Sequence, residues 1–220
     1  KIAERLLSLF LESKYGVRIP LLERASEYLD EIQLLDMTEI MESRVKGYDK
    51  EDYGRFHALR GLENLARLTR NPVLFESARL RMQPEVSDAS CVDIARVYHE
   101  CGYIEEALSW LDRIHSAGNW YEDEKDELLL AIYRDKGDVQ QAENAARRLF
   151  ERGRTMARFE CLVSVIGAEQ RGRLLDEQTQ SILQQEKFRQ EDATFLIDAG
   201  RTDAAASYLI YWACEINGND

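Results

Sequence analysis

Arginines gather in one part of this chain, residues 147–173, where seven of them stand against three glutamates. An arginine guanidinium forms paired, parallel hydrogen bonds with carboxylates and phosphates. The stretch therefore predicts one of two things. It is a basic patch that holds an acidic peptide or a phosphate backbone, or it is a solvated helix face whose arginines neutralise neighbouring acids. The residues concerned are Arg147, Arg148, Arg152, Arg154, Arg158, Arg171 and Arg173.

The histidines and cysteines lack the spacing of a metal site. His99 and Cys101 are two positions apart, on different sides of a helix, whereas two ligands on one helix need a spacing of three or four. We therefore predict no metal and no cofactor. A catalytic pairing of Cys91 with His99 would need a further residue brought close by the fold, and a core cysteine is the favoured interpretation. Scattered cysteines predict free thiols in a reducing compartment, and so a cytoplasmic protein.

Adjacent carboxylates are common, as in Glu105-Glu106 and Glu122-Asp123-Glu124. Acid–base catalysis needs carboxyls whose surroundings push their pKa values apart, and these runs instead have the pattern of exposed helix starts. The sequence also has no glycine loop of the kind that cradles phosphates. We therefore predict that the chain is not an enzyme.

Several aromatic residues suit either a binding groove or packing between successive helix pairs: Trp110, Trp120, Tyr121, Tyr211 and Trp212. Tyr211 and Trp212 lie in the last predicted helix, where a repeat array usually needs a polar cap. An apolar helix there suggests contact with a further segment or another subunit.

The composition bounds the class of protein. The chain has 220 residues, 45% of them hydrophobic, and a net charge of −12. Non-specific nucleic-acid binding rests on a positive surface, so this charge disfavours it while leaving a local basic face open. No apolar run approaches the ~20 residues of a membrane span, so we predict no membrane contact. Because the chain begins with Lys1 and shows no signal-peptide pattern, we expect a piece of a longer protein.

Apolar residues at helical spacing cover almost the whole chain, and no segment alternates as a strand does. The N-terminal part predicts a helix that ends near Gly16, a second over 20–32 and a short third over 38–46. A helix capped by Asp49 follows, and then one over 71–82 that begins at an Asn-Pro pair.

From residue 87 onward the pattern predicts pairs of helices. Ser87 or Asp88 caps the first of them, and Asn119 marks a boundary. The expected helices cover residues 88–101, 104–116, 121–136, 138–152, 155–168, 175–187, 190–199 and 202–216.

A repeat organises the middle of the chain. Glycine tolerates the left-handed turn at a helix end, and an alanine early in the next helix lets two helices approach closely. Gly200 and Ala205 echo the pattern, and Gly172 continues its spacing. The two clear units are Tyr98, Gly102 and Ala107 and, shifted by 35 residues, Tyr133, Gly137 and Ala142.

These units resemble the tetratricopeptide repeat family. The first reads Ile94-Ala95-x-x-Tyr98-x-x-x-Gly102-x-Ile104-x-x-Ala107, and the second reads Leu129-Leu130-x-x-Tyr133-x-x-x-Gly137-x-Val139-x-x-Ala142. Helical-repeat C-terminal regions of bacterial proteins look similar. The resemblance implies an all-α fold, a right-handed α-solenoid of antiparallel helix pairs with about ten or eleven helices. We divide the chain into non-consensus helix pairs over 1–86 and repeats over 87–220.

Such an array predicts a protein–protein interaction scaffold. Its concave face, lined by the first helix of each pair, would bind a peptide or a partner domain. Three other functions stay open: a nucleic-acid-associated accessory domain that uses the stretch 147–173, an enzyme with a helical active site, and a helical spacer attached to a catalytic or zinc-binding domain outside this chain. The candidate partner-binding residues are Tyr98, His99, Tyr133, Arg134, Arg154 and Arg158.

Overall fold

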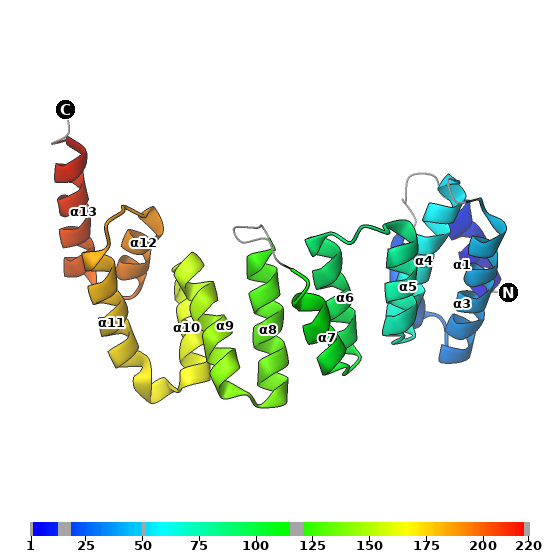
Figure 1. Ribbon diagram of the computed structural model, residues 1–220, viewed down its shortest axis with the longest axis horizontal. Helices are drawn as coiled ribbons and strands as arrows, with labels where there is room; N and C mark the ends of the chain where they lie inside the picture. The colour runs from blue at the N-terminus through cyan, green and yellow to red at the C-terminus, as the bar shows by residue number, and fades with distance from the viewer. Residues whose placement is uncertain (1, 13–18, 50–51, 115–120, 218–220) are drawn as a thin grey trace. The chain divides into compact units, whose positions relative to one another are not determined.

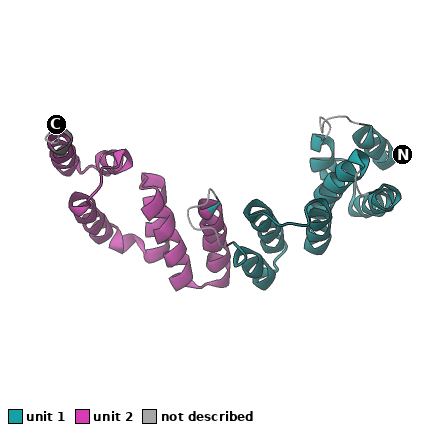
Figure 2. Ribbon diagram, turned by 45° about the horizontal axis from the view of Figure 1, so that its top comes forward, with its two compact units in different colours: residues 1–121 teal, residues 122–220 magenta. Residues whose placement is uncertain are grey.

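The computed structural model describes residues 2–12, 19–49, 52–114 and 121–217, and over these ranges it is all-helical, without strands. Thirteen α-helices follow one another there, more than the ten or eleven expected, and helices adjacent in the chain pack together (Figure 1). The chain forms two compact units, residues 1–121 and 122–220 (Figure 2). The expectations at Gly16 and Asn119 lie outside the described residues.

Unit 1 holds the N-terminal helices together with the first consensus helix pair, so the start of the repeat at residue 87 lies inside this unit. Its helices are α1 (Ile2–Leu11), α2 (Ile19–Glu23), α3 (Glu31–Gly47), α4 (Tyr53–Leu68), α5 (Pro72–Met82), α6 (Asp88–Glu100) and α7 (Ile104–Leu111), with a short 3-10 helix at Ala25–Glu27.

The helix expected over 20–32 is wrong, because the chain starts a new helix within it. The Asp30 carboxylate accepts a hydrogen bond from the Gln33 amide at 2.8 Å, and the Gln33 side chain accepts one from the Asp30 amide at 3.2 Å. This reciprocal capping box satisfies two amides at a helix start. As a result α3 begins at Glu31, and the short helix expected over 38–46 is only its second half.

The other helix starts follow their capping residues. Asp52, rather than the expected Asp49, caps α4 by accepting from the Gly54 amide at 2.6 Å. Asn71 and Ser87 cap α5 and α6 through the amides of the third residue on, which confirms both predicted starts. A side-chain oxygen at this position satisfies an amide that has no partner inside the helix.

The core of unit 1 is closed by α1 against α4. Phe10 stacks on the His57 ring at 4.2 Å between centroids, and His57 Nε2 donates to the Phe10 carbonyl at 2.8 Å. Gly61 permits this approach, since a Cβ there would lie 2.7 Å from the Phe10 ring and 2.8 Å from the Met41 methyl. His57 is therefore a core residue.

One turn closes four of the helix pairs. Its central residue has left-handed backbone, with φ of 88° at Gly102, 71° at Gly137, 73° at Gly200 and 51° at Arg70. In each case the next amide donates to the carbonyl four residues before the turn residue, at 2.7–2.9 Å. This pattern satisfies carbonyls at the end of the helix. The pair α4–α5 thus shares the turn of the repeat, although arginine replaces the glycine.

The repeat alanines are all buried, with Ala107, Ala142 and Ala205 0%, 1% and 2% exposed. The continuation of the repeat at Gly172 is wrong. Gly172 lies inside a helix that begins at Arg171, and the chain turns at Gly167 instead, with φ of 120°. The 35-residue spacing fails here because the turn comes at Gly167, before the position that the spacing predicts.

Unit 2 holds the remaining described helices. Phe150, Phe159 and Phe195 come from three helices and lie 5.3–5.8 Å apart between ring centroids, and all three are fully buried. Its helices are α8 (Glu122–Lys136), α9 (Val139–Arg152), α10 (Met156–Ile166), α11 (Arg171–Gln184), α12 (Gln190–Asp198) and α13 (Thr202–Asn217), with a short 3-10 helix at Ala168–Gln170.

Candidate functional site

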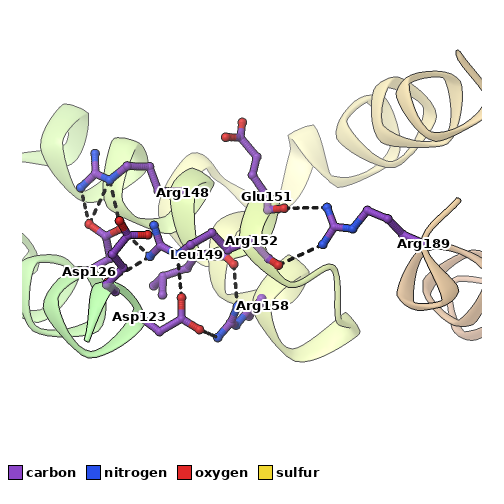
Figure 3. Close-up of polar contacts among 9 residues, drawn as sticks. Asp123, Asp126, Arg148, Leu149, Glu151, Arg152, Arg158 and Arg189 are labelled. Carbon is purple, nitrogen blue, oxygen red and sulfur yellow. Dashed lines mark hydrogen bonds and ion pairs between the residues drawn. The ribbon is translucent and has the colours of Figure 1, made fainter. Parts of the chain in front are cut away.

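Two aspartates of α8 meet three arginines from the next two helices (Figure 3). Arg152 Nε donates to Asp123 at 2.6 Å, and Arg158 donates to the other oxygen of the same carboxylate. Arg148 Nε donates to Asp126 at 2.9 Å. Arg152 also donates to Asp126, so this one guanidinium joins both carboxylates.

The two carboxylates differ in their surroundings. Asp126 is only 4% exposed, and a buried carboxylate needs partners of opposite charge. Asp123 is more exposed. Burial alone would raise the pKa of Asp123, but the hydrogen bonds from Arg152 and Arg158 outweigh it and hold the pKa below its ordinary value. Asp123 is therefore charged at neutral pH, and the two aspartates together anchor α9 and α10 to α8.

The remaining arginines of the stretch also pair with carboxylates of their own chain. Their geometry is that of arginines that neutralise neighbouring acids. The pairs are Arg147 with Glu143, Arg154 with Asp192, Arg171 with Glu160, and Arg173 with Glu177.

Arg154 and Arg158, two of the candidate partner-binding residues, are both engaged inside unit 2. Arg154 is 11% exposed and donates to Asp192, a fully buried carboxylate, at 2.8 Å. Arg158 donates to the Leu149 carbonyl at 2.8 Å as well as to Asp123. Arg189 extends the network by donating to the carbonyls of Glu151 and Arg152 at the end of α9 (Figure 3).

The other candidates are divided between the units. Arg134 donates to Ser164 Oγ at 2.7 Å and to the Cys161 carbonyl at 3.3 Å, so it holds the end of α10. Tyr133 beside it is half-buried, and so is His99 in unit 1. The structure gives no single cluster of the six residues.

Tyr98 lines an open pocket of about 390 Å³ formed by α5, α6 and α7. Its hydroxyl donates to Glu76 Oε2 at 2.5 Å, and Trp110 Nε1 donates to the same oxygen at 3.3 Å. Arg113 covers the Trp110 ring, with its guanidinium carbon 3.7 Å from the ring centroid. The pocket therefore joins two aromatic side chains, a cation and three carboxylates, of which Glu76 is bonded to both aromatic side chains.

Sequence reasoning identified Tyr98 but missed Glu76 and Arg113. Glu76 belongs to the pair α4–α5, whose sequence lacks the repeat pattern, so the repeat could not relate Glu76 to Tyr98. The sequence left two roles open for Trp110: in a binding groove, or in packing between successive helix pairs. At 3% exposure it is buried, and it still lines the pocket.

The aromatic residues near the C-terminus are largely packed together. Trp212 lies 6.4 Å from both Phe188 and Tyr208 between ring centroids, and Tyr208 is buried. Tyr211 is 57% exposed beside them. Trp120 lies outside the described residues.

Cys91 is buried, and burial raises its pKa, which keeps the sulfur as a neutral thiol at pH 7. Across the described ranges, no group of three or more histidine, cysteine, aspartate or glutamate side chains gathers as a metal site. No helix in the part of the chain that the structure describes is long and apolar enough to cross a membrane.

Over the described residues, the fold and these contacts define an all-helical protein built from packed helix pairs, several of which are joined within their own unit by charged side chains. No family model, no curated protein and no solved structure matches the chain.

Proposed function

We propose that this chain is a non-catalytic protein-interaction scaffold, a right-handed α-solenoid of the tetratricopeptide type that binds a peptide segment of a partner. The solenoid is supported by the turn that recurs at Gly102, Gly137 and Gly200 with the same hydrogen bond. The buried alanines that follow each turn support it too. Stacked pairs of this kind create extended surfaces for binding.

The observation that carries the proposal is the pocket beside Tyr98. It is open, it lies on the first consensus pair, and its walls come from the consecutive helices α5, α6 and α7. Tyrosine and tryptophan are the side chains most often found at the energetic centre of protein interfaces. A peptide side chain that enters this pocket would touch both.

The arginine stretch 147–173 counts against the nucleic-acid alternative. Its guanidinium groups are already paired with carboxylates, so phosphates would have to displace these intramolecular partners. A binding surface for a phosphate backbone needs charge that remains available.

The proposal is tested with a random peptide library displayed on phage and selected against the full chain. Ser109 is exposed on the pocket wall, and Ser109→Trp blocks the pocket without entering the core. Ser43 is exposed on α3, so Ser43→Trp is the matched control. We expect selected peptides to lose at least about tenfold in affinity for Ser109→Trp and to bind Ser43→Trp as they bind the parent protein. Lack of enrichment, or equal binding to both variants, would refute the proposal.

A further inference from the structure

The pocket beside Tyr98 is lined by three carboxylates. Glu76 comes from α5, and Glu105 and Glu106 come from the exposed first turn of α7. Acidic side chains alone do not define a ligand. Here they surround a recess of about 390 Å³ with aromatic walls, and that combination is what recognises organic cations.

Glu76 is held by two hydrogen bonds in this pocket. The two bonds that fix it, from the Tyr98 hydroxyl and from Trp110 Nε1, both end on Oε2. In the part of the chain that the structure describes, no hydrogen bond or ion pair ends on Oε1. A carboxylate that is positioned by two donors, with one oxygen left over, is prepared to accept a hydrogen bond from a ligand.

The electrostatics of the pocket agree with this geometry. Burial raises the pKa of the Tyr98 hydroxyl well above its ordinary value, and the neighbouring charges of Glu76 and Glu106 raise it further. Burial disfavours a charge of either sign, but the part of the shift that comes from Glu76 and Glu106 reports a negative potential, and a negative potential stabilises a positive charge. The potential around Tyr98 therefore favours a cationic group.

Arg113 already shows how a cation is held there. Its guanidinium carbon lies 3.7 Å from the centroid of the Trp110 ring, although the side chain is exposed at the surface. A guanidinium from another molecule would meet the same ring and the Glu76 carboxylate, which accepts a hydrogen bond from the Trp110 indole N–H. Arg113 would then be displaced or would share the ring.

We propose that this pocket binds the arginine side chain of a partner peptide, with Glu76 as its carboxylate and Trp110 as its ring, and that Arg113 is a resident competitor for that ring. This inference rests on the proposed function and names the chemistry of the partner segment. It also agrees with the net charge of −12, which attracts basic partners from a distance.

The test titrates the full chain with two short Gly-Ser peptides, one with a central arginine and one with citrulline, its neutral isostere. The indole N–H signal of Trp110 in the nitrogen–proton NMR spectrum, assigned through Trp110→Phe, reports on the pocket. We expect the arginine peptide to shift this signal with a Kd of about 1 mM and to bind roughly tenfold or more tightly than the citrulline peptide. Equal binding of the two peptides, or no shift with either, would overturn the inference.

Three variants separate the parts of the site. Glu76→Gln removes the charge but keeps an acceptor for Tyr98, and it should weaken the arginine peptide roughly tenfold. Arg113→Ala frees the ring and should tighten binding about two- to fivefold. Arg44→Ala removes the same charge from an exposed position on α3 and should change nothing beyond about a factor of 1.5.

Contrary outcomes are clear for each variant. Unchanged affinity in Glu76→Gln refutes the carboxylate, and unchanged or weaker affinity in Arg113→Ala refutes the competitor. If Glu76→Gln does not fold, the exposed Glu106→Gln takes its place, with an expected loss of about twofold, and an unchanged affinity there counts against the site. Library peptides that require the pocket but contain no required arginine would overturn this inference while leaving the proposed function intact.

Discussion

Removing the Asp126 carboxylate should destabilise unit 2 more than removing the carboxylate of any exposed ion pair in this unit. Asp126 is 4% exposed and accepts hydrogen bonds from Arg148 and Arg152. Breaking a buried pair typically costs about 3–5 kcal/mol, because it leaves an uncompensated buried charge. The two guanidinium groups retain access to water, with side chains 45% and 28% exposed, so we expect about 2–3 kcal/mol for Asp126→Ala.

The matched control is Glu143→Ala, which removes the Arg147 partner within the same helix. That pair is an i,i+4 pair at the surface of α9 and is expected to contribute only about 0.3–0.5 kcal/mol. Both variants change one acid to alanine, so they differ mainly in the burial of the lost carboxylate.

Hydrogen exchange read peptide by peptide measures the effect within unit 2. Amides of α8 and α9 should exchange about 30- to 140-fold faster in Asp126→Ala than in the parent protein, since 1.4 kcal/mol is a factor of ten. Amides of α4 in unit 1 should keep their rates, because every residue of the network belongs to unit 2. If Asp126→Ala and Glu143→Ala agree within about 0.5 kcal/mol, the network adds no stability and the reasoning is refuted.

Three further predictions concern single positions. The pKa of Asp123 is lower in the folded protein than its ordinary value of 3.8. Its contribution to stability is therefore complete above pH 3.8 and is lost as the pH falls through the pKa of the folded state. The urea midpoints of the parent and Asp123→Asn should differ by a constant amount at about pH 5–8 and converge in acid. Gly61→Ala should cost about 1–3 kcal/mol and speed exchange in α1, since the new methyl meets Phe10 in a closed core; an unchanged thermal midpoint would contradict this. Gly137→Ala should cost about 1 kcal/mol in the left-handed turn, whereas Gly172→Ala, inside α11, should stabilise by about 0.5–1 kcal/mol; equal effects in urea unfolding would contradict the turn assignment.

Much of the fold could be predicted because local residues determine where helices start and end. Asn71, Ser87, Gly102 and Gly137 mark boundaries that the structure reproduces. The failures came where two local signals competed. The apolar stripe over 20–32 continues past Asp30, and only the contact with Gln33 shows that a new helix begins there.

The candidate site could be predicted only in part, because pairing between distant helices is not visible along the chain. The arginine content of 147–173 was evident, but Asp126 stands 22 residues from Arg148 and Asp192 stands 38 residues from Arg154. Such partners are selected by helix packing. Tyr98 was found through the repeat, while Glu76 became its partner only through the contact of α5 with α6.

Arg70 occupies a turn position where the other three helix pairs have glycine, and it keeps the same backbone hydrogen bond. A side chain in left-handed backbone costs about 1–2 kcal/mol. Unlike glycine, arginine has a side chain that can bond to the next helix pair. The Arg70 guanidinium donates to the Glu100 carbonyl at 2.6 Å, at the end of α6. The free-energy cost of this backbone conformation and the gain from the hydrogen bond are of similar size. A substitution of Arg70 that relieves the strain should therefore also remove the coupling between neighbouring helix pairs. A substitution at Arg70 can thus change how stiffly neighbouring helix pairs are joined while leaving the free energy of unfolding nearly the same.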